Sequence, residues 1–92
     1  MSDNVRANPA EIRKFVAMLK RFNQDLANNK RILHRQFTIL GETWQDQKHR
    51  QYAEDFKQLM QKLDNFLSSS EAQIPLLEKD AALLEEFLRR RR

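Results

Sequence analysis

The sequence has no cysteine, one glycine and two prolines among its 92 residues. Without cysteine it cannot form disulfides, thiolate zinc sites or thiol nucleophiles. Because β-sandwiches and barrels need many glycine- and proline-containing turns, the composition argues against an all-β fold. Charged residues make up 33% and hydrophobic residues 40% of the chain, which is typical of long helices. The length predicts a single domain, residues 1–92.

Long apolar runs are also missing. No uninterrupted stretch approaches the ~20 residues that a membrane-spanning helix needs. The first residues, Met1 to Asn4, are polar and differ from a secretory signal peptide. We therefore expect no membrane insertion, and any export would proceed without a cleavable signal peptide.

The basic pI of about 9.8 suggests a nucleic-acid partner, but the distribution of charge weakens this interpretation. Four of the 17 basic residues are Arg89–Arg92, and the remaining 13 balance the 13 acidic residues. Residues 1–40 have a net charge of +5 and residues 41–88 a net charge of −5. These segments are expected to pair, within one chain or between chains. On the polar face of the first helix no aromatic residue is interleaved with the basic ones to stack on bases, so nucleic acid is not an expected partner.

Apolar residues recur in alternating steps of three and four through the first half of the chain. This spacing predicts a helix over about residues 9–40 with an apolar seam. Asn8 is its expected N-cap, Pro9 suits its first turn, and Glu11 completes a capping box. The predicted seam consists of Ile12, Phe15, Leu19, Phe22, Leu26, Leu33, Phe37 and Leu40. Val16, Ile32, Phe37 and Ile39 widen the stripe, so the helix should touch more than one neighbour.

The only glycine, Gly41, follows this helix directly. A glycine there predicts the left-handed residue that ends a helix, with a turn over residues 41–46. Trp44 in the turn is expected to pack over the end of the hairpin. Thr43 or Asp46 is expected to cap the next helix.

A second helix is predicted over about residues 46–88, followed by the basic tail 89–92. Its seam begins with Tyr52, Phe56, Leu59, Leu63 and Phe66. Ser68–Ser70 and Pro75 indicate a bend or break near residues 68–75. Both a bent continuous helix and a new helix capped at Ser70 fit this segment.

Two antiparallel helices can shield only one side of each wide stripe. The rest would form an exposed apolar patch, which usually marks an interface. We therefore predict an all-α fold, an antiparallel helical hairpin that dimerises into a four-helix bundle.

Candidate catalytic and metal-binding groups do not converge in the sequence. His34 and His49 lack a second ligand at helical i+3 or i+4 spacing. Neighbouring acids such as Glu54 and Asp55 diverge around a helix, whereas acid–base catalysis needs groups that meet in a pocket. A chain with one glycine has no glycine-rich phosphate loop. We predict no enzymatic activity, catalytic residue, metal site or cofactor.

In these features the chain resembles the WXG superfamily, the early secreted antigen-like helical hairpins of type VII (ESX-like) secretion. The resemblance rests on the helix start at Pro9–Ile12, on Leu40 before the turn, and on Tyr52 and Phe56 in the second helix. Trp44-Gln45-Asp46 stands where the family has Trp-x-Gly. Asp46 therefore departs from the motif, although aspartate also favours helix starts.

The resemblance also implies an export pattern near the C-terminus. Leu76, Asp80, Leu83 and Phe87 match the family's spacing of hydrophobic and acidic residues in its second helix. The family's Tyr-x-x-x-Asp/Glu signal is absent, because the only tyrosine, Tyr52, is followed by Phe56.

The resemblance implies a small secreted or secretion-associated protein that acts as a dimer through protein–protein contacts. Its partners would be a second copy or a paralogous hairpin, and a secretion ATPase or larger effector. It would be secreted, or cytoplasmic before export. Two alternatives remain: a cytoplasmic adaptor or chaperone for a larger effector, and a nucleic-acid or membrane-surface binder acting through the basic first helix and Arg89–Arg92.

Overall fold

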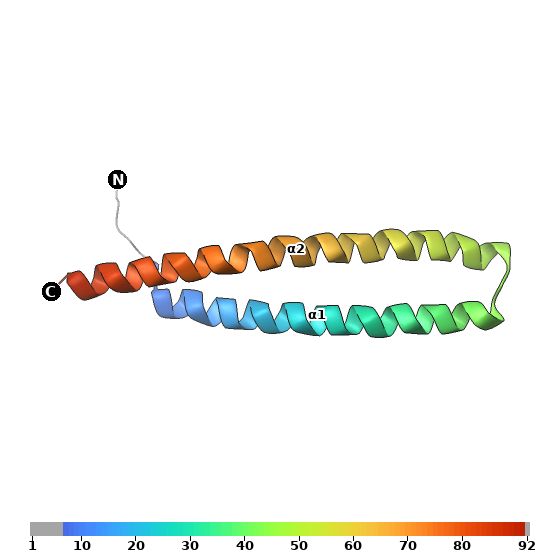
Figure 1. The fold of residues 1–92 in the computed structure, drawn as a ribbon, viewed down its shortest axis with the longest axis horizontal. Helices are drawn as coiled ribbons and strands as arrows, with labels where there is room; N and C mark the ends of the chain where they lie inside the picture. Colours follow the sequence, from blue (N-terminus) through green and yellow to red (C-terminus); the bar gives the residue numbers. More distant parts are fainter. Residues whose placement is uncertain (1–6, 92) are drawn as a thin grey trace.

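The computed structural model describes residues 7–91, which form two helices and a short connection (Figure 1). Helix α1 spans Pro9–Thr43, and helix α2 spans Gln47–Arg90. The helices run antiparallel in an elongated hairpin of 70 × 25 × 14 Å. At its C-terminal end, α2 extends past the beginning of α1. The predicted all-α helical hairpin is therefore confirmed.

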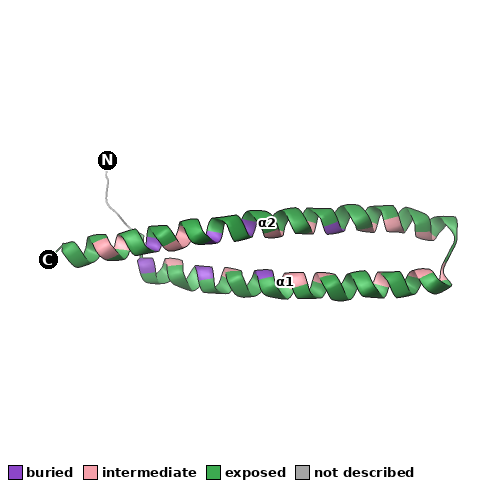
Figure 2. Cartoon of the chain, in the orientation of Figure 1, coloured by how far each residue is buried: buried purple, intermediate pink, exposed green. Residues whose placement is uncertain are grey.

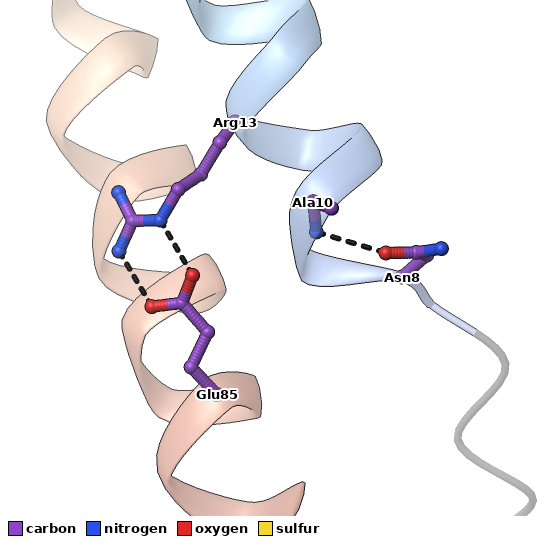
Figure 3. A network of polar contacts seen from close by, with 4 residues as sticks. All are labelled: Asn8, Ala10, Arg13 and Glu85. Carbon is purple, nitrogen blue, oxygen red and sulfur yellow. Dashed lines mark hydrogen bonds and ion pairs between the residues drawn. The ribbon is translucent and has the colours of Figure 1, made fainter.

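Side-chain capping fixes where both helices begin. The Asn8 Oδ1 atom accepts a hydrogen bond of 2.8 Å from the backbone N–H of Ala10, and Pro9 takes the first helical position (Figure 3). The predicted N-cap at Asn8 is confirmed. At α2, the Asp46 Oδ1 atom accepts a hydrogen bond of 3.0 Å from the His49 N–H. Of the two predicted caps for this helix, the structure uses Asp46.

Gly41 has a different role from the one its sequence position predicts. It lies inside α1 and its φ is not positive, so the prediction of a left-handed helix-ending residue was wrong. The helix ends where Trp44 becomes extended, with its N–H donating to the Leu40 carbonyl oxygen at 3.0 Å. A Cβ atom at residue 41 would lie only 3.1 Å from Cε1 of His49. Glycine is therefore explained by the close approach of α2 rather than by a turn.

Helix α2 continues through Pro75 without a break, so no new helix begins at Ser70. Proline removes one backbone hydrogen bond, but Pro75 is exposed and water can satisfy the freed carbonyl group. Arg89 and Arg90 form the last turn of α2, whereas Arg92 of the predicted tail lies outside the described residues.

The contact between the helices buries only short patches of each helix (Figure 2), and it includes only part of the predicted seam. Its buried apolar residues are Val16, Met60, Ile74 and Ala81. Half-buried members of the predicted seam are Ile12, Leu19, Leu26, Phe37, Phe56 and Leu63. The remaining predicted members, Phe15, Phe22, Leu33, Leu40, Tyr52, Leu59 and Phe66, are 42–54% exposed in the single hairpin, so their place in a seam shared with a second hairpin stays a prediction. The stripe is wider than one contact, and the partner helix covers only one edge of it.

Asn23 and Ser70 also lie in the buried contact. The Asn23 Nδ2 atom donates to the Ser70 Oγ atom at 2.8 Å, and that hydroxyl donates back to Asn23 Oδ1 at 3.0 Å. Each side chain therefore satisfies the other where water is excluded.

Candidate protein-interaction surface

One long side of the hairpin is charged and joined by ion pairs between the helices. Arg13 binds the Glu85 carboxylate through two hydrogen bonds of 2.7 and 2.8 Å (Figure 3). Lys20 lies 2.9 Å from Glu78, and Lys30 pairs with Asp64. The opposite charges predicted for the two halves of the sequence thus meet within one chain. We call this side the charged face.

The Arg13–Glu85 pair shifts both pKa values in the directions that favour ionisation. Hydrogen bonding to Glu85 raises the pKa of Arg13, and the same contact lowers the pKa of Glu85. Both groups are exposed, so water screens the pair and its contribution to stability is small.

The opposite long side is apolar and exposed. On α1 it consists of Phe15, Met18, Phe22, Ile32, Leu33, Ile39 and Leu40, and on α2 of Tyr52, Leu59, Phe66, Leu76, Leu83 and Phe87. Their fractional exposures run from 42% to 63%. Because these residues recur at three-, four- and seven-residue steps, they follow one stripe along each helix. We call this side the apolar face.

Two contacts join the stripes of α1 and α2 into a single surface. The rings of Phe22 and Phe66 meet edge to face, with centroids 5.9 Å apart. Nearer the connection, Leu40, Tyr52 and Leu59 line one shallow depression of about 520 Å³. Single exposed apolar residues are ordinary on protein surfaces, but a continuous row across two helices indicates an interaction site.

An aromatic cluster closes the hairpin at its connected end. Half-buried Trp44 lies 5.4 Å from the His49 ring and 5.7 Å from the Tyr52 ring, measured between centroids. His49 stacks on Phe37 at 5.1 Å, and its buried Nε2 atom has no hydrogen-bond partner among the described residues. The hydrogen bond from the His49 N–H, with a smaller contribution from Trp44, lowers the pKa of Asp46. The three predicted turn residues, Gly41, Trp44 and Asp46, thus all lie around His49.

The residues of the predicted export pattern lie on the outside of α2. Leu76, Leu83 and Phe87 are 62%, 58% and 42% exposed, and Asp80 is also exposed. The Arg91 guanidinium lies 5.8 Å from the centroid of the Phe87 ring. The pattern therefore forms the C-terminal part of the apolar face on α2.

Residues 7–91 contain neither a cluster of metal ligands nor a membrane-spanning helix. No three histidine, aspartate or glutamate side chains there gather closely enough to hold a metal ion. No helix in this part of the chain is long and apolar enough to cross a membrane. His34 and His49 lie apart, beside Phe56 and Phe37 respectively.

Sequence reasoning predicted an exposed apolar patch and named many residues of the apolar face as seam residues, but it missed Met18. Met18 stands three residues after Phe15 and four before Phe22, and this spacing could have indicated a second stripe beside the seam. Met60 was also missed as a core residue.

Comparisons with protein families, with curated proteins and with solved structures find no match to this chain. The resemblance to the WXG superfamily therefore stays a prediction.

Proposed function

We propose that the chain is a WXG-like interaction protein whose hairpins pair into a four-helix bundle through the apolar face, apart from its C-terminal part on α2 from Leu76 to Phe87. We further propose that this dimer is a secreted or secretion-associated component of a type VII (ESX-like) system. The single observation that carries the proposal is the one-sided exposure of large apolar side chains on both helices.

The thin core of the hairpin supports this pairing. Among the described residues, no large side chain is fully buried, whereas most of the large apolar ones are about half exposed. Burial of apolar surface contributes ~25 cal/mol per Å², so covering the apolar face would add stability that one hairpin cannot supply. The charged face already pairs its own ions, and this favours apolar contact over charge as the source of dimer affinity.

The residues that carry the family resemblance support the proposed role. Trp44 forms a compact end to the hairpin, and the pattern from Leu76 to Phe87 is open to a partner. In the proposal, this part of α2 contacts the export machinery.

Sedimentation equilibrium tests the dimer. We expect twice the 11.1 kDa mass of one chain at micromolar concentration. Phe22→Glu and Leu59→Glu should each give a monomer, because a charge would be buried between two apolar faces. Gln24→Glu and Gln58→Glu add the same charge to exposed residues nearby and should remain dimeric. A wild-type chain that sediments as one hairpin would contradict homodimerisation.

Export is tested in the native host with the untagged chain. The protein should appear in the culture medium and should stay inside cells when the type VII ATPase is deleted. Leu83→Ala and Phe87→Ala should reduce export without changing the sedimented mass, while Lys79→Ala serves as an exposed control on the same helix. Retention in wild-type cells together with a larger co-purifying protein would instead favour the adaptor alternative.

A further inference from the structure

A groove of about 1090 Å³ runs between the helices on the charged face. Its floor is apolar and is formed by Phe37, Phe56, Met60 and Ala53. The rings of Phe37 and Phe56 stack with centroids 4.5 Å apart and separate this groove from the depression on the apolar face. The groove is therefore a second surface, on the opposite side of the hairpin from the proposed dimer contact.

The sequence of α1 explains why the helices leave a groove here. The buried contact is filled by Val16 and, seven residues later, by Asn23, but Lys30 stands at the next equivalent position of α1. Lys30 turns its ammonium group out to Asp64, and His34 on the next turn lines the groove without filling it. Phe37, Ala53 and Phe56 on the floor therefore stay half-buried, whereas Met60 beneath them is buried.

The ion pairs between α1 and α2 do not continue from Lys30–Asp64 along this groove towards the connection. Every seventh residue of α2 in this row is acidic at Asp64, Glu71, Glu78 and Glu85, but the two earlier members of the row, Arg50 and Lys57, are basic. Arg31 and Arg35 line the groove from α1, and Lys57 lines it from α2. Among residues 7–91, none of these three cations has a carboxylate within ion-pair distance.

We propose that this groove binds an acidic amphipathic helix of a partner protein. Leucines and similar apolar residues of that helix would cover Phe37, Ala53 and Phe56, and its carboxylates would reach Arg31 and Arg35 on one edge and Lys57 on the other. Unpaired cations on both rims of an apolar floor complement such a helix in charge and in polarity. The same complementarity, basic against acidic around an apolar line, already joins α1 to α2.

The dimensions of the groove fit a short helical segment. Its lining spans residues 30–38 of α1 and residues 53–65 of α2. These are stretches of roughly two to three helical turns at 1.5 Å per residue. An occupant of about 14 residues would lie along both helices as a third, packed between them at a usual interhelical distance of ~8–10 Å.

A synthetic peptide provides the test on the full-length chain. The probe is a fluorescein-labelled peptide of about 14 residues, with leucines at helical i, i+3, i+4 and i+7 spacing and glutamates beside them. We expect saturable binding by fluorescence anisotropy with a Kd on the order of 10 µM, since small interfaces are weak. A scrambled peptide of the same composition should not bind.

Charge reversal locates the site. Arg35→Glu and Lys57→Glu should each weaken binding roughly fivefold or more, and a lysine-for-glutamate peptide should bind the double variant better than wild type. Arg21→Glu is the matched control, since Arg21 stands two heptads before Arg35 and outside the groove. Circular dichroism confirms that the variants remain folded.

Several outcomes would overturn the proposal. These are no binding up to ~1 mM peptide, equal loss with Arg21→Glu, and no effect of the rim variants. Binding of dodecanoate in place of the peptide would assign the groove to an anionic amphiphile instead. The proposed dimer is tested separately, because Arg35→Glu and Lys57→Glu should keep the wild-type sedimented mass, whereas Phe22→Glu should change that mass and leave peptide binding intact.

Discussion

Asn23 and Ser70 exchange two hydrogen bonds across the buried contact between α1 and α2, although they are 47 residues apart in sequence. They are the only buried polar side chains on the helices in the described part of the chain. A slide of one helix along the other would separate both groups from their partners. The pair therefore favours one axial register in a contact whose apolar residues would tolerate several.

Removing either partner of this pair should destabilise the hairpin. Asn23→Ala or Ser70→Ala leaves the other group buried without a hydrogen bond, and we expect a loss of ~1–3 kcal/mol for each. Asn23→Leu combined with Ser70→Ala removes both polar groups and should recover most of that loss. Urea unfolding at one fixed chain concentration measures all three variants. Additive losses in the double variant would show that the two side chains act independently.

Gly41→Ala tests whether the close approach of His49 is the reason that residue 41 is a glycine. Alanine is favoured over glycine inside a helix by ~1 kcal/mol, but the new Cβ would meet the His49 ring at 3.1 Å. That ring is confined between Phe37 and Trp44, so we expect net destabilisation by about 1 kcal/mol.

The same substitution in a His49→Ala background should be stabilising, because the clash is gone while the helix preference remains. A double-mutant cycle measured by thermal unfolding gives the coupling between the two sites. A gain in stability for Gly41→Ala alone would contradict the close-approach explanation.

Asp46 should make the stability of the hairpin depend on pH in acid. Its pKa is lowered in the folded chain, so its stabilising contribution is present above the unfolded value of about 3.9 and is lost as pH falls through the folded pKa. Asp46→Asn keeps a capping oxygen but does not titrate, and should lose less stability on acidification. Asp46→Ala lacks the cap at every pH.

Glu85 titrates in the same direction, because Arg13 lowers its pKa. The comparison is therefore best made with Glu85→Gln in every variant, over about pH 2–7. Parallel stability curves with and without the Asp46→Asn substitution would exclude Asp46 as a source of the pH dependence.

Pro75→Ala should stabilise α2. Proline inside a helix is less favourable than alanine by ~3 kcal/mol, and this residue is exposed within a continuous helix. Part of that gain is offset because proline also restricts the unfolded chain, so we expect an increase of roughly 1–3 kcal/mol. Equilibrium unfolding in urea measures it, with Ala72→Ser as an exposed control of small effect. A decrease would indicate that the proline ring itself makes a stabilising contact.

The sequence was sufficient to predict the hairpin. It was not sufficient to predict which residues of each apolar stripe face the other helix. Steps of three and four predict helices, and Asn8 marks a helix start, because capping and periodicity are local properties. The choice between Phe15 and Val16 as the inward residue is not local. It depends on which edge of a wide stripe the other helix covers, and hydrophobicity alone favours the larger side chain that in fact stays outside. The prediction that Gly41 ends the helix was wrong for a related reason, because the residue that approaches it, His49, belongs to the other helix.

The antiparallel arrangement also sets an order in which contacts can form. Trp44 meets His49 across a few residues, whereas Arg13 meets Glu85 across 72. Closing a short loop costs less chain entropy than closing a long one. Folding should therefore begin at the aromatic cluster, and the contacts between α1 and α2 should then form in order towards the termini. Substitutions near Trp44 should then slow folding, and those near Arg13 should mainly speed unfolding.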